Sequence, residues 1–165
     1  MATVKFDSLP SNARLWVFAA GRPLDAEERG RLLALVDAFL EQWKAHGAPL
    51  SAARDWRYDR FLLIGVDQSA ADASGCSIDA MVHQLAGLER ALGVELLDHG
   101  PVLFRRDDRI ERLPRPAFND LARRGDVSSD TIVFDNTVTR VGDVREGRWE
   151  TRASQSWHAR AFNLL

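Results

Sequence analysis

The order of hydrophobic patterns predicts an α+β fold with a ferredoxin-like βαββαβ core and a C-terminal extension. The prediction depends on three observations: short apolar runs typical of buried strands, two amphipathic stretches typical of helices, and their order along the chain. A right-handed crossover would place both helices on one face of an antiparallel sheet. We therefore expect a single domain over residues 1–165, with its core at about 14–106 and the extension at about 107–165.

The first predicted strand is the run LWVFAA at residues 15–20, which a glycine and a proline close. The first predicted helix follows at 24–47. Asp25 and Glu28 have the spacing of a capping box at its start, and Gly47 ends it. Its apolar stripe consists of Leu32, Leu33, Val36, Phe39, Leu40 and Trp43.

Residues 51–66 are expected to be extended in two parts. Residues 53, 55, 57 and 59 alternate with residues 54, 56, 58 and 60, and this period of two is typical of a half-exposed strand. Residues 61–66 are uniformly apolar and predict a central strand. The pattern leaves open whether one bent strand or a hairpin with a turn near Asp59 covers the segment.

A second helix is predicted from Cys76 to Gly93, followed by a strand at 102–106. Its apolar stripe consists of Ile78, Met81, Val82, Leu85, Leu88 and Leu92. The last third is less regular, with a short helix expected at 116–124 and a further strand at 131–138. The C-terminal segment carries two tryptophans and is expected to cover the sheet.

Composition excludes several classes of function. A net charge of −2 over 165 residues argues against a broad nucleic-acid surface, and the arginines of 105–115 are interleaved with acids. A single cysteine excludes an intramolecular disulfide and a cysteine-cluster metal site, and favours a reducing compartment. The N-terminus shows no signal-peptide pattern and the apolar runs are too short for a bilayer, so we expect a cytoplasmic protein.

Nucleotide and metal motifs are missing from the sequence. Residues 142–149 have the Gly-x4-Gly spacing of a phosphate loop, but Arg148 and Trp149 stand where Lys and Ser or Thr are required. No Gly-x-Gly-x-x-Gly occurs, and the four histidines are scattered without metal-binding spacing. We therefore expect no cofactor and no metal.

The chain's one cysteine, Cys76, stands at the expected N-terminus of the second helix. There the free N–H groups and the helix dipole stabilise a thiolate, which makes Cys76 a candidate nucleophile. A general base would have to come from another segment, and His158 and His99 are the candidates, since His83 lies about 10 Å further along the helix axis. Asp79 lies one turn further along the helix, and its negatively charged carboxylate would repel a thiolate. The alternative is that Cys76 is a small packing residue.

Several further side chains are candidates for binding a ligand. They are Asp67, Ser74, Ser77, Asp79 and Trp157. Those that precede or open the second helix could equally form turn and cap hydrogen bonds. Trp157 could floor a pocket or, with Trp149, cover the sheet. Ser156 and His158 stand two apart, which is poor geometry for a Ser–His pair within a regular strand or helix.

Four stretches carry a resemblance to known sequences: LWVFAAGRPL, FLLIGVDQSAADASGCSIDAMVHQL, LGVELLDHGPVLFR and the SW near the C-terminus. They resemble a family of small uncharacterised bacterial proteins that often carry the automatic label "ABC transporter ATPase". The similarity covers most of the chain, and Ser-Gly-Cys-Ser-Ile-Asp is its most specific part. The label implies nucleotide hydrolysis, but the phosphate-loop residues are missing, so no ATPase is expected. The resemblance assigns no catalytic residues.

The sequence thus predicts a non-enzymatic module that binds a small molecule or a protein, and that can form a homodimer through a sheet edge or face. The alternative is a thiol-dependent enzyme or redox sensor that uses Cys76 at the helix N-terminus, with His158 as a candidate base. RNA binding on the open sheet face is a weaker third interpretation, because the chain lacks an aromatic RNP-like strand and a basic excess. Membrane and nucleic-acid partners are not expected.

Overall fold

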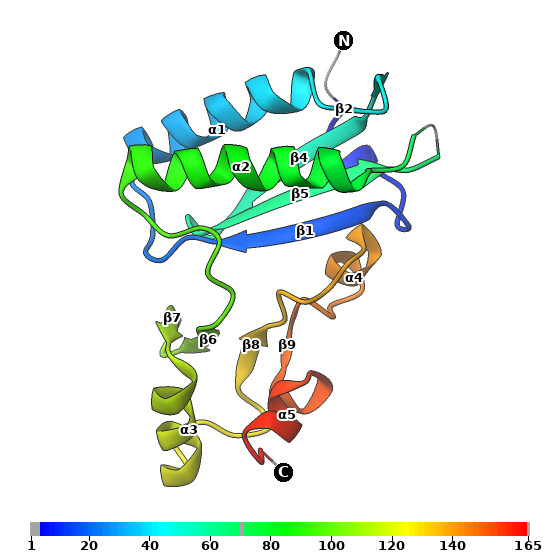
Figure 1. Cartoon of the computed structure of the whole chain (residues 1–165). Coiled ribbons are helices and arrows are strands. Elements are labelled where there is room, and N and C mark those ends of the chain that lie inside the picture. The colour runs from blue at the N-terminus through cyan, green and yellow to red at the C-terminus, as the bar shows by residue number, and fades with distance from the viewer. Residues whose placement is uncertain (1–3, 70, 165) are drawn as a thin grey trace. The chain divides into compact units, whose positions relative to one another are not determined.

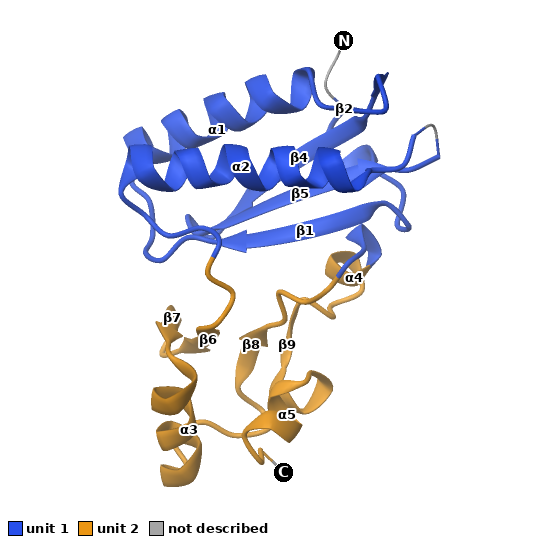
Figure 2. Cartoon of the chain, viewed as in Figure 1, with its two compact units in different colours: residues 1–97, 139–142 blue, residues 98–138, 143–165 orange. Residues whose placement is uncertain are grey.

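The computed structural model describes residues 4–69 and 71–164. The chain divides into two compact units (Figure 2): unit 1 comprises residues 1–97 and 139–142, and unit 2 comprises residues 98–138 and 143–165. Each unit has its own cluster of buried apolar side chains. The unit boundary near residue 97 precedes the expected core boundary near residue 106. That the whole chain forms one domain stays a prediction.

Unit 1 is an antiparallel sheet covered on one face by two helices (Figure 1). The strands β1 (Arg14–Ala19), β5 (Phe61–Asp67) and β4 (Ser51–Arg57) lie in that order, with β5 in the centre. The helices are α1 (Ala26–Glu41) and α2 (Gly75–Leu92). Their apolar stripes and the inner face of the sheet form a continuous core. The expected antiparallel sheet with helices on one face is present here.

Helix α1 begins as predicted but ends earlier. Its capping box is complete, because Glu28 N–H donates to Asp25 Oδ1 at 2.8 Å and Asp25 N–H donates to Glu28 Oε1 at 3.2 Å. The helix ends at Glu41 rather than Gly47, since His46 and Gly47 both have positive φ and form the turn of a small hairpin. That hairpin joins β2 (Lys44–Ala45) to β3 (Ala48–Pro49).

Residues 51–67 form a hairpin, which decides the alternative that the sequence left open. Tyr58 and Asp59 both have positive φ, and Arg57 pairs with Phe61 across the turn. The turn therefore falls at the expected place. Strand β5 is buried along nearly its whole length, as its apolar run predicted.

Unit 2 contains a four-stranded antiparallel sheet, in the order β7-β6-β8-β9, and short helices. Its strands are β6 (Val102–Arg106), β7 (Arg109–Leu113), β8 (Ile132–Phe134) and β9 (Glu150–Arg152). Its helices are α3 (Arg115–Arg124), most of α4 (Val141–Arg145), the 3-10 turn η2 (Ala153–Gln155) and α5 (His158–Ala161). A further 3-10 turn, η1 (Phe6–Ser8), belongs to unit 1. The expected helix at 116–124 is thus present as α3, and the expected strand at 131–138 is shorter.

The ferredoxin-like arrangement is not confirmed. The predicted strand at 102–106 exists as β6, but it pairs with β7 and β8 inside unit 2. Its pairing is local, because Asp107 and Asp108 have positive φ and turn the chain directly back into β7. Residues 139 and 140 instead pair with the outer edge of β1. Leu15 N–H donates to the Thr139 carbonyl at 2.8 Å, and Arg14 forms an isolated β-bridge with Arg140.

Candidate functional site

Cys76 is the second residue of α2 and is exposed to solvent. The turn that holds it is fixed by a reciprocal cap. Ser77 N–H donates to Ser74 Oγ at 3.1 Å, and Ser74 N–H donates to Ser77 Oγ at 2.7 Å. Ser77 Oγ also donates to the Ser74 carbonyl at 2.8 Å. Both hydroxyls are therefore engaged in starting the helix, which is the cap role that the sequence offered as the alternative to ligand binding.

The two acidic candidate residues near Cys76, Asp67 and Asp79, differ in their surroundings. Asp67 Oδ1 accepts from Ser69 N–H at 3.0 Å, and this backbone hydrogen bond lowers the pKa of the Asp67 carboxyl. Asp79 is exposed on the outer face of α2. Cys76 lies in unit 1 and His158 in unit 2, so a pairing of these two residues stays a prediction.

Within unit 2, His158 and Ser156 are in direct contact. His158 opens α5 and is only 1% exposed, and its Nδ1 lies 2.7 Å from Ser156 Oγ. The poor geometry expected within a regular strand or helix does not apply, because Ser156 is in neither. It is an extended residue between η2 and α5 (φ −134°, ψ 174°), so its side chain turns back over the first turn of α5. His158 N–H also donates to Ser156 Oγ, at 3.3 Å.

Burial lowers the pKa of His158 to about 4, with the Asp135 carboxylate opposing the shift and the Arg115 guanidinium reinforcing it. The ring is therefore neutral near pH 7, and its Nδ1 can accept a hydrogen bond from the Ser156 hydroxyl. A base with so low a pKa is a poor proton acceptor for a serine at neutral pH. The contact suits a structural role better than nucleophilic catalysis.

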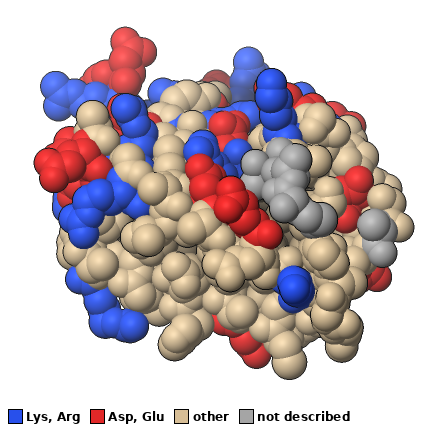
Figure 3. Space-filling view, turned by 90° about the horizontal axis from the view of Figure 1, so that it is seen from above, with Lys and Arg blue, Asp and Glu red and all other residues tan. Residues whose placement is uncertain are grey.

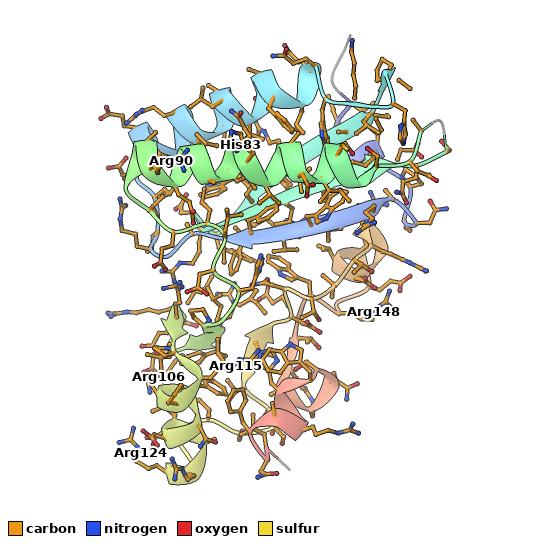
Figure 4. The ribbon with its side chains drawn as sticks, viewed as in Figure 1. His83, Arg90, Arg106, Arg115, Arg124 and Arg148 are labelled. Atoms are coloured by element: carbon orange, nitrogen blue, oxygen red, sulfur yellow. The ribbon has the colours of Figure 1, made fainter. Side chains whose placement is uncertain are left out.

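Trp157 lies between two partners in the same unit (Figure 4 labels Arg115). Its indole stacks on the His158 ring, with centroids 3.8 Å apart and planes inclined by 24°. The Arg115 guanidinium lies 4.8 Å from the indole centroid. Since a ring at 3.8 Å leaves no room for a second group on that side, Arg115 covers the opposite face. Trp157 therefore presents its edge, rather than a free face, to a ligand.

An open groove of about 710 Å³ lies beside α5 in unit 2. It is lined by Ser154, Ser156, Trp157, Ala159, Arg160, Ala161 and Asn163. This volume falls within the range of about 300–1,000 Å³ that is usual for small-molecule sites. Of the predicted site residues, Trp157 lines the groove directly. Sequence reasoning missed Arg160 and Asn163, because nothing in the local pattern distinguishes them from solvated helix-end residues.

Another cavity, of about 350 Å³, lies in unit 1 beside η1, α1 and β4. Arg54, in its lining, donates from two nitrogens to the carboxylate of Asp37, at 2.8 and 2.9 Å. This hydrogen-bonded pairing raises the pKa of Arg54. A ligand would have to break an ion pair to use the charge. The groove beside α5 is therefore the better candidate site.

No match to this chain is found among protein-family models, characterised proteins or solved structures. Residues 4–69 and 71–164 contain no group of three or more His, Cys, Asp or Glu side chains arranged to hold a metal ion. Over the same residues, no helix has the length and apolar character needed to cross a membrane. The geometry of the groove beside α5 is therefore the basis for assigning a function.

Proposed function

We propose that this chain is a non-enzymatic cytoplasmic module that binds a small molecule in the groove beside α5. The observation that supports the proposal is the groove itself, which combines a suitable volume with an apolar floor and a cation. Trp157, Ala159 and Ala161 supply apolar surface, and Arg160 supplies the positive charge. The ligand that fits these groups has an apolar or aromatic body and one anionic substituent.

Two features favour binding over catalysis. Ser156 Oγ is engaged by the ring and the backbone N–H of His158, and His158 has a pKa too low for efficient base catalysis near pH 7. We also propose that the chain belongs to the family of small bacterial proteins that its sequence resembles. This membership adds no catalytic group.

The proposal is tested with 1-anilinonaphthalene-8-sulfonate, a dye with an aromatic body and one sulfonate. We expect Arg160→Gln to weaken dye binding by about tenfold, because it removes a charge-assisted hydrogen bond. Ala161→Glu should weaken binding further, since it places a carboxylate beside the sulfonate. Arg109→Gln removes an exposed arginine of β7 outside the groove lining and is the matched control. Binding is measured by fluorescence titration and calorimetry.

Circular dichroism melting should show that all three variants remain folded. If the dye does not bind the wild type, or if Arg109→Gln and Arg160→Gln weaken it equally, the groove is not the binding site. Cys76→Ser should leave dye binding unchanged, because Cys76 is not among the residues that line the groove.

The exposure of Cys76 favours one second candidate, the thiol-dependent enzyme or redox sensor. Intact-mass kinetics of alkylation by iodoacetamide, for native and denatured protein across a range of pH, tests it. We expect the exposed native thiol to be alkylated at a rate close to that of the denatured chain. A native rate far above the denatured rate at pH 7 would instead support an activated thiol, and labelling only after denaturation would show a packing residue.

A further inference from the structure

The outer face of α2 carries few charges. Figure 3 shows the surface on the helix side of unit 1. Charged side chains are dense over part of this surface and sparse over the rest. In α1 the charged residues are Glu27, Glu28, Arg29, Arg31, Asp37 and Glu41, whereas in α2 they are only Asp79, Glu89 and Arg90. Glu89 is engaged at the flank of the helix, where it accepts from Leu96 N–H at 2.7 Å. The outward charges of α2 are therefore Asp79 and Arg90.

Helical geometry places these two charges on one line along the outer face. Met81, Leu85 and Leu88 are buried and define the inner face of α2. At 100° per residue, Asp79 and Arg90 both project to the opposite side, since eleven residues correspond to just over three whole turns. Both are exposed. Among the residues that the structure describes, neither has an ion-pair partner.

The surface between the two charges is built for close approach. His83 lies on the same outward line, and beside it Ala86 and Gly87 add almost no side-chain bulk. Val82 at its margin is 39% exposed, which is unusual for an apolar side chain of this size in the chain. A helix face with small residues in the middle lets a second helix pack at short interaxial distance.

We propose that this face, defined as Asp79, His83, Ala86, Gly87 and Arg90, is the interface of a symmetric homodimer in which the two α2 helices pack antiparallel. The inference is independent of the groove beside α5. A two-fold axis at the midpoint between residues 84 and 85 places each Asp79 opposite the partner's Arg90. The same axis places each His83 opposite the partner's Ala86.

Charge selects a second copy in this orientation. The antiparallel pairing forms two Asp–Arg ion pairs, whereas a parallel pairing would oppose Asp to Asp and Arg to Arg. The face has no net charge, so it does not attract an acidic or a basic partner. Its two opposite charges do complement those of a second copy. One helix of 18 residues is about 27 Å long, and such a contact is at the small end of specific interfaces. A micromolar dimer is therefore expected.

Sedimentation equilibrium and light scattering of the full chain up to about 0.5 mM measure the association. The wild type should dimerise. Asp79→Arg and Arg90→Asp should each weaken the dimer by about tenfold or more, because each opposes like charges twice. The double variant with both changes restores complementarity and should dimerise again. A monomeric wild type, or single variants that associate as tightly as the wild type, would overturn the proposal.

Oxidative cross-linking tests the antiparallel geometry. In a Cys76→Ser background, Ala86→Cys should form a disulfide dimer, because the two copies of residue 86 lie only about 4.5 Å apart along the axis. Wild-type Cys76 should not cross-link, since its two copies lie about 25 Å apart along the axis. Efficient cross-linking through Cys76 and none through Ala86→Cys would contradict the proposed pairing. Circular dichroism confirms that each variant is folded.

Discussion

Replacing Phe118 by alanine should lower the free energy of unfolding by about 3–5 kcal/mol. The Phe118 side chain is fully buried in unit 2. It makes T-shaped contacts with Phe104, at a centroid distance of 5.0 Å, and with Phe162, at 4.8 Å. Alanine would leave a cavity between α3, β6 and the C-terminal residues, and rigid aromatic neighbours fill such a cavity poorly.

Urea unfolding followed by near-UV circular dichroism measures the effect, and Phe118→Leu is the matched control. Leucine keeps most of the buried apolar volume, so its cost should be clearly smaller than that of alanine. The groove beside α5 depends on the same core, so the alanine variant should also lose binding of the sulfonate dye. An alanine variant as stable as the leucine variant would show that the three phenylalanines do not form the core of unit 2.

The free energy of unfolding of the wild type should also fall by up to about 3 kcal/mol between pH 6.5 and pH 4, because of His158 alone. Burial holds the pKa of His158 at about 4 in the folded protein, against an ordinary value of 6.5. Between these two values the unfolded chain binds one proton more than the folded chain, so stability falls as the pH falls. The contribution is fully present above pH 6.5 and is lost completely below pH 4.

The comparison that isolates this effect is urea unfolding of the wild type and of His158→Asn at pH 7, 5.5 and 4. Asparagine does not titrate, and its amide oxygen can accept from the Ser156 hydroxyl, as a neutral Nδ1 can. The stability difference between the two proteins should therefore shrink or reverse as the pH falls. Carboxylates with depressed pKa values, such as Glu28 at about 2, titrate alike in both proteins. Parallel pH profiles would contradict the assignment of a buried neutral histidine.

The sequence predicted those parts of the fold that depend on local signals. The start of α1 follows from Asp25 and Glu28, and β5 follows from an apolar run bounded by turns. The end of α1 was misplaced because His46 and Gly47 share a positive-φ turn that overrides helix continuation. The strand at 102–106 pairs with β7 through the positive-φ turn at Asp107 and Asp108, and with β8 through a segment further along the chain. Hydrophobic periodicity encodes neither partner.

The candidate site could be predicted only in part. Trp157 was recognised because a large aromatic near a chain end must be buried or bind something. The contact between Ser156 and His158 was missed because it depends on a break in regular structure at Ser156, which shows only once the chain is folded. Arg160 joins the groove through the turn of a four-residue helix, a feature too short for periodicity to reveal.

The segment 139–142, which closes the outer edge of β1, has a consequence for synthesis. Leu15 N–H donates to the Thr139 carbonyl and Val141 N–H donates to the Ala13 carbonyl, so the N-terminal unit is completed by residues translated more than a hundred positions later. While the nascent chain leaves the ribosome, β1 has an unpaired edge until residues 98–138 have been made and residues 139–142 follow. A fragment that ends at residue 97 keeps that edge open permanently. Its aggregation, compared with that of the full chain, therefore reports on how much protection the residues after 97 provide.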